Sequence, residues 1–100
     1  MGVKKEGSAG FEVYYRELCE AASKLGFEIR EDNLLKLGVK TEGGFCWYRG
    51  QDLVLIERAL PVKKRFELLR DVLKSAECDL GRVYLSPAVR RVLGQNMDGG

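Results

Sequence analysis

Hydrophobic and polar positions repeat with two different periods along this chain, and the changes of period mark the elements we expect. From Gly10 onward, apolar residues recur at three- and four-residue steps, which predicts an amphipathic helix. Gly26 is placed to end this helix, since glycine accepts the positive φ of a helix C-terminus. A second helical stripe of about four turns begins after Pro61, which fits the first turn of a helix because that position needs no N–H.

Between these helices the period falls to two, which predicts strands joined by short turns. The first two strands alternate strictly around the polar turn Glu31-Asp32-Asn33, so one face of that hairpin is expected to be solvated. A second hairpin follows Gly43-Gly44 and turns at Gly50-Gln51-Asp52. Its second strand contains an unbroken apolar run, 53–56, which is typical of a central strand covered on both faces. The four expected strands are 27–30, 35–40, 45–49 and 53–58.

The last part of the chain predicts a short fifth strand, 82–85, followed by a helix over 86–94. Ser86 is a suitable N-cap for that helix, Pro87 fits its first position, and Gly94 is expected to end it.

The predicted fold is therefore α+β, in the order α-β-β-β-β-α-β-α, with a mostly antiparallel sheet of about five strands. It contains two long helices and a short C-terminal one. We expect one domain over residues 10–94, with disordered tails at 1–9 and 95–100, because both ends are Gly-rich and lack apolar periodicity.

The composition excludes several kinds of chemistry but does not identify one. The 100 residues include no histidine, which removes the commonest general acid/base and the commonest zinc ligand. With 17 basic and 15 acidic residues, the net charge of +2 gives no argument for a nucleic acid or an anionic membrane. No metal-ligand spacing, phosphate-binding loop or dinucleotide fingerprint occurs, so we expect no metal and no cofactor.

The cysteines and the N-terminus indicate a reducing location. Cys19, Cys46 and Cys78 are odd in number and widely spaced, which is typical of reduced thiols. No signal peptide and no apolar run long enough to cross a membrane is present, so we expect a cytoplasmic protein with no membrane partner.

Six residues are candidates for a binding site: Cys46, Trp47, Tyr48, Arg49, Arg65 and Arg91. Cys46 follows two glycines and precedes a cation, which is one setting for an activated thiolate, although the chain has no histidine to act as its base. Trp47 and Tyr48 beside Arg49 resemble a stacking surface for single-stranded nucleic acid. A basic cluster offers an anion or phosphate site, made from Arg58, Lys63, Lys64 and Arg65 and joined by Arg90 and Arg91. The alternative is structural: a packed cysteine, core aromatics and solvated charges.

Several short motifs resemble a family of small bacterial proteins of unknown function. They are Gly43-Gly44-Phe45-Cys46, Arg49-Gly50, Leu60-Pro61 with Arg65, Asp79-Leu80, Val83-Tyr84-Leu85, and Pro87 with Arg91. This resemblance covers roughly residues 43–93 and implies a bacterial cytoplasmic origin. It carries no activity and assigns no residue a role.

The helix after Pro61 is also similar to the helix of small metallopeptidase-like domains, in which a hairpin precedes an HExxH motif. Both histidines are missing from residues 61–73, so that resemblance implies a chain without the metal chemistry.

From the sequence we therefore expect a small non-enzymatic binding or protein-interaction domain, with a homodimer as one form of the interaction. Two alternatives remain open, a weak nucleic-acid or anion binder and a thiol-dependent enzyme that uses Cys46.

Overall fold

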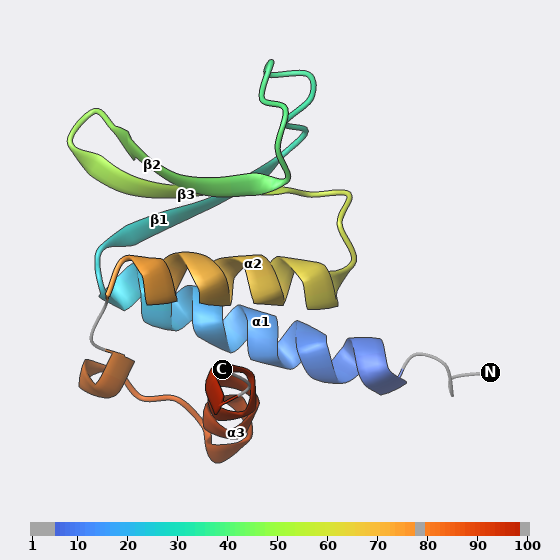
Figure 1. Ribbon diagram of the computed structural model, residues 1–100, viewed down its shortest axis with the longest axis vertical. Helices are drawn as coiled ribbons and strands as arrows, with labels where there is room; N and C mark the ends of the chain where they lie inside the picture. Colours follow the sequence, from blue (N-terminus) through green and yellow to red (C-terminus); the bar gives the residue numbers. More distant parts are fainter. Residues whose placement is uncertain (1–5, 78–79, 99–100) are drawn as a thin grey trace.

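The computed structural model describes residues 6–77 and 80–98, and the elements lie in three layers (Figure 1). A three-stranded sheet forms the first layer, two long helices cover one of its faces, and a short helix packs beneath them. The elements are α1 (Glu6–Lys24), β1 (Phe27–Asp32), β2 (Gly43–Tyr48), β3 (Gln51–Glu57), α2 (Val62–Ser75), the 3₁₀ turn η2 (Leu80–Arg82) and α3 (Pro87–Asp98).

The α+β class is confirmed, but the number of strands and their directions were wrong. The sheet has the order β1-β3-β2, with β1 parallel to β3 and β2 antiparallel to β3. It is a mixed sheet of three strands in the described part of the chain, where about five mostly antiparallel strands were expected. β3 is the central strand, as its apolar run predicted.

The expected strand 35–40 is a series of turns. Backbone hydrogen bonds from Leu37 and Val39 to the Leu34 carbonyl fold this segment back on itself, and the Asn33 side chain accepts one from Lys36 N–H. Such local bonds compete with strand pairing. Leu34 is fully buried, whereas Leu35 is 75% exposed, so the alternation here does not mark a buried strand face.

The expected strand 82–85 is absent as well, because α1 and α2 lie between this segment and the sheet (Figure 1). Its in-and-out alternation is real: Leu85 is buried, Val83 packs against the core, and Tyr84 is exposed. The segment docks on the helices instead, since the Ser86 N–H donates to the Glu17 carboxylate of α1.

Most of the signals expected at the helix ends are confirmed in the structure, and Gly94, which does not end its helix, is the exception. Gly26 ends α1 with φ +102°, Pro87 is the first residue of α3, and the Ser86 hydroxyl accepts a hydrogen bond from Val89 N–H at 3.4 Å. α1 begins at Glu6, inside the expected tail, and α3 continues past Gly94 to Asp98.

The main core lies between the sheet and the two long helices. Val54 and Ile56 of β3 face the helices, while Phe66, Leu69 and Leu73 of α2 are fully buried against them. Leu53 is buried on the opposite face of β3 and is not part of this core. Figure 1 shows the loop between β1 and β2 rising on that opposite side.

The hairpin turn lies one position earlier than expected. Arg49 and Gly50 both have positive φ, +54° and +76°, as a type I′ turn requires. Gly43 and Gly44 open the hairpin with φ +141° and +158°, so they have the architectural role that the sequence indicated.

Candidate binding edge of the sheet

β2 is an edge strand, and the direction of its N–H and C=O groups shows which residues face the open edge. Hydrogen-bonded and non-hydrogen-bonded pairs alternate along an antiparallel ladder. Glu57 N–H donates to the Glu42 carbonyl at 2.9 Å, so even-numbered residues of this segment turn their backbone groups toward β3. Gly43, Phe45 and Trp47 therefore direct theirs toward the free edge.

One end of this free edge is already capped. The Thr41 hydroxyl accepts a hydrogen bond from Gly43 N–H at 2.8 Å and donates one to the Gly43 carbonyl at 3.0 Å. Phe45 and Trp47 have no such cap among the described residues, which leaves them as the open part of the edge.

The side chains of Phe45 and Trp47 point toward the helix side of the sheet but are poorly covered. Phe45 pairs with Val54 of the core face, and Trp47 lies two positions further along the same face. On this edge strand Phe45 is 51% exposed and Trp47 65% exposed. Large exposed apolar side chains gathered in one place are typical of interaction surfaces.

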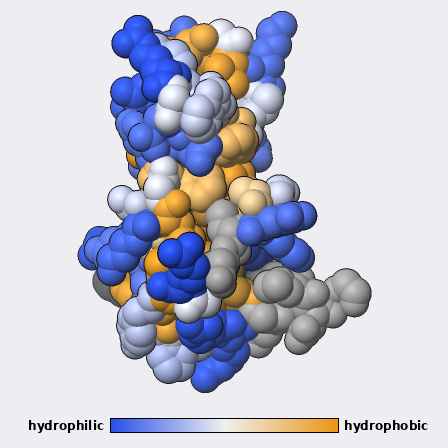
Figure 2. All heavy atoms as spheres, turned by 90° about the vertical axis from the view of Figure 1, so that its left-hand side faces the viewer, coloured by the Kyte–Doolittle hydropathy of each residue, from blue (hydrophilic) through white to orange (hydrophobic). Residues whose placement is uncertain are grey.

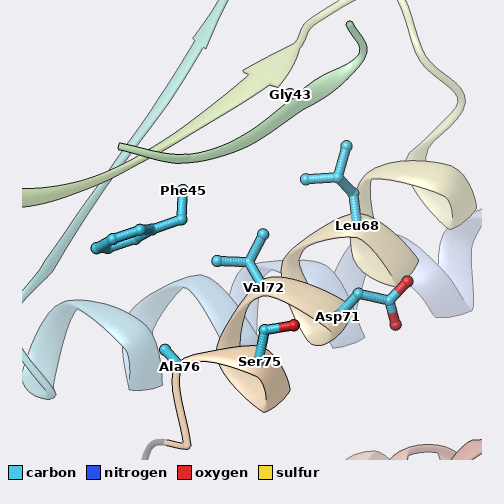
Figure 3. A pocket seen from close by; sticks show the side chains of 7 residues that line it. All are labelled: Gly43, Phe45, Leu68, Asp71, Val72, Ser75 and Ala76. Atoms are coloured by element: carbon cyan, nitrogen blue, oxygen red, sulfur yellow. The ribbon is translucent and has the colours of Figure 1, made fainter. Parts of the chain in front are cut away.

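Beneath this edge lies an open groove of about 480 Å³ between β2 and α2 (Figure 3). Leu68 and Val72 of α2 point up toward the strand, and Phe45 closes one end near Ala76. From the side of the hairpin turn, Figure 2 shows apolar residues at the narrow waist between the sheet and the helices. The groove is lined by Gly43, Phe45, Leu68, Asp71, Val72, Ser75 and Ala76.

The other candidate residues of the hairpin lie on the opposite face of the sheet or at its turn. Cys46 is half-buried and Tyr48 half-exposed on the outer face, where the Arg49 guanidinium lies 5.2 Å from the Tyr48 ring centre. Trp47 and Tyr48 therefore do not form one stacking surface.

The three consecutive cations of α2 point in different directions, because successive helix residues are rotated by about 100°. The Lys63 ammonium lies 5.8 Å from the Phe11 ring centre, on the α1 side. Arg65 is held between elements: it bonds the Leu60 carbonyl at 3.0 Å and the Glu31 carboxylate at 3.2 Å. Arg91 is exposed on α3, and no hydrogen bond or ion pair of the described residues joins it to Arg65.

Arg65 belongs to a polar cluster that joins α1, β1 and α2. The Tyr15 hydroxyl donates to the same Glu31 carboxylate that Arg65 contacts, and the guanidinium lies 5.3 Å from the Tyr15 ring centre. Cys19 lies one helical turn after Tyr15. Burial raises the pKa of Tyr15, and the hydrogen bond to Glu31 raises it further. Burial likewise raises the pKa of Cys19 to about 11.

These raised pKa values predict a loss of stability at alkaline pH. The unfolded chain releases the Cys19 proton near pH 9.0 and the Tyr15 proton near 10.0, whereas the folded chain keeps both. The two protonated groups therefore contribute their full stabilisation below pH 9. We expect the free energy of unfolding to fall as the pH rises toward 11. Urea titrations across this range measure the change. A Tyr15→Phe, Cys19→Ala variant should show a flatter profile, and an unchanged slope would contradict the assignment.

Two features of the structure were not predicted from the sequence, the groove beneath β2 and the polar cluster around Arg65. Leu68, Val72 and Ala76 follow each other at four-residue steps, beside the stripe that forms the core. The apolar face of α2 is wider than packing against one core requires. This width could have predicted a second apolar surface on the helix. The Tyr15, Glu31 and Arg65 cluster joins three elements and had no local signal.

Among the described residues, no group of acidic or cysteine side chains is arranged to hold a metal ion. No helix in that part of the chain is long and apolar enough to span a membrane. Comparisons with protein-family models, with curated proteins and with solved structures found no match.

Proposed function

We propose that this chain is a protein-interaction domain whose partner adds a strand to the free edge of β2. The observation that carries the proposal is the open backbone of Phe45 and Trp47 next to exposed aromatic side chains and an apolar groove. In strand addition, main-chain hydrogen bonds supply affinity, and alternate side chains enter pockets that supply specificity. Unpaired edges of this kind are normally shielded in proteins that do not use them.

The groove indicates what the added strand should look like. Every second residue would face the helices and meet Leu68, Val72 and Ala76, so apolar side chains are favoured there. The residues between them would lie on the outer face beside Tyr48, which is half-exposed.

Selection from a random displayed peptide library on the immobilised domain tests this function. We expect enriched peptides with apolar residues at alternate positions. Their affinity should fall at least tenfold with Trp47→Pro, which removes the free-edge N–H and keeps the bonds to β3. Trp47→Val is the matched control, because it also removes the indole and retains the N–H.

Two results would overturn strand addition to peptides. One is the failure of any peptide to be enriched above background. The other is equal affinity of the selected peptides for the proline and valine variants, which would place their binding elsewhere.

A further inference from the structure

We propose that the strand added to β2 is β2 of a second copy of this chain, antiparallel, about a two-fold axis that passes beside Cys46. This proposal rests on the proposed function, since it names the partner for the same edge. The self-complementarity of the edge in backbone, side-chain volume and charge supports it.

The backbone sets the register. Phe45 and Trp47 offer open N–H and C=O groups, while Gly43 is capped by Thr41. In the proposed register, Phe45 of each copy lies opposite Trp47 of the other. The open N–H and C=O groups of both residues are then hydrogen-bonded on both sides of the axis. That register leaves the Thr41 cap in place.

The side chains of this register fit each other on both faces of the sheet. On the helix side, each Phe45 lies opposite a Trp47 of the other copy, and aromatic cross-strand pairs of this kind stabilise sheets. On the outer face, Tyr48 lies opposite Gly44, which has open space where a side chain would be. Bulky residues at one end of β2 thus meet glycines at the other.

The charges favour the antiparallel direction. Glu42 precedes β2 and Arg49 follows it, and both are exposed. Antiparallel self-pairing brings each Glu42 close to the other copy's Arg49, at both ends of the joined strands. A parallel arrangement would instead place like charges together. Opposite charges across an interface fix orientation and register.

The aromatic surface available is also substantial. Phe45, Trp47 and Tyr48 are each at least half exposed. Taking about 200 Å² for a fully buried aromatic side chain, six of them from two copies would cover roughly 600 Å². This is a large share of the roughly 1,200–2,000 Å² of a stable interface. Each contact occurs twice, as in any two-fold dimer.

Cys46 provides a direct test of the register. It lies at the axis in a non-hydrogen-bonded pair, where Cα atoms are about 4.5 Å apart, a spacing that a disulfide can bridge. In a Cys19→Ala, Cys78→Ala background, diamide should convert two Cys46 thiols into one intermolecular disulfide, with diamide accepting the two electrons and two protons. Peptide mass spectrometry should find Cys46 joined to Cys46. As a matched control, a thiol at Gly44→Cys with Cys46→Ser should cross-link at least tenfold less.

Sedimentation equilibrium tests the association itself. We expect a dimer whose dissociation constant rises at least tenfold with Trp47→Lys and stays unchanged with Leu35→Lys, which alters an even more exposed apolar residue away from β2. Circular dichroism checks that both variants remain folded. A monomer at every concentration, or a dimer without the Cys46 cross-link, would overturn the proposal. A monomer that still binds selected peptides would leave strand addition standing with another protein as partner, whereas loss of both would end the proposed function too.

Discussion

Replacing Gly43 with alanine is expected to lower the free energy of unfolding by about 3 kcal/mol or more. A Cβ atom at this position would lie 2.1 Å from the Leu55 carbonyl oxygen and 3.1 Å from the Ile56 Cα atom. Both are backbone atoms of β3, so relief requires the two strands to separate. The φ of +141° adds a conformational cost of about 1–3 kcal/mol for a residue with a side chain. Urea denaturation followed by circular dichroism measures the difference.

Gly44→Ala is the matched control for this experiment. Its φ is +158°, and no heavy atom outside its neighbours in the chain lies within 4 Å of the added Cβ. We therefore expect only the backbone cost of this φ, about 1 kcal/mol, at the low end for a positive φ because +158° is close to the extended region. Equal losses for the two variants would show that the close approach of Gly43 to β3 is not what makes this glycine necessary.

The helices and several of their ends could be predicted from the sequence because their signals are local, although α1 begins earlier than expected and α3 continues past Gly94. Gly26, Ser86 and Pro87 act through their own backbone geometry or through groups a few residues away. The second hairpin also follows from local chemistry, since a two-residue turn with positive φ needs Gly50 or a similar residue. Such features are specified within a short stretch of chain.

The number of strands was predicted wrongly because two segments with alternating apolar and polar residues are not strands. In residues 35–40 the side chain of Asn33 and the carbonyl of Leu34 organise turns that compete with a strand. In residues 82–85 alternation served to bury Leu85 against helices. Alternation shows that one face is buried, and it does not show what covers that face.

The candidate site was predicted in part. The sequence identified the stretch Cys46 to Arg49 and predicted a central position for the strand that follows it, but it did not show that β2 itself lies at the edge of the sheet. Because β1 pairs with β3, β2 lies at the edge of the sheet. This pairing between segments distant in the sequence leaves Trp47 exposed. The opposing groove depends on how α2 lies under β2, which no local pattern encodes.

Phe66→Ala is expected to cost about 3–5 kcal/mol, a large part of the roughly 5–15 kcal/mol that stabilises a domain. Phe66 is fully buried in α2, and its ring centre lies 5.5 Å from that of Phe11 and 6.3 Å from that of Tyr14, both in α1. Truncation removes these contacts and leaves a cavity between the two long helices, which the surrounding helices and sheet can fill only partly.

Phe45→Ala makes the same chemical change at the sheet edge and serves as the comparison. Because Phe45 is 51% exposed, its truncation removes less buried surface and leaves no closed cavity. We expect a loss of about 1 kcal/mol when urea midpoints are measured at concentrations too low for self-association. The two variants should therefore separate stability from binding: Phe66→Ala weakens the fold, while Phe45→Ala leaves the fold and weakens strand addition. Similar losses of stability would contradict the division between a core that holds the helices together and an edge kept open for a partner.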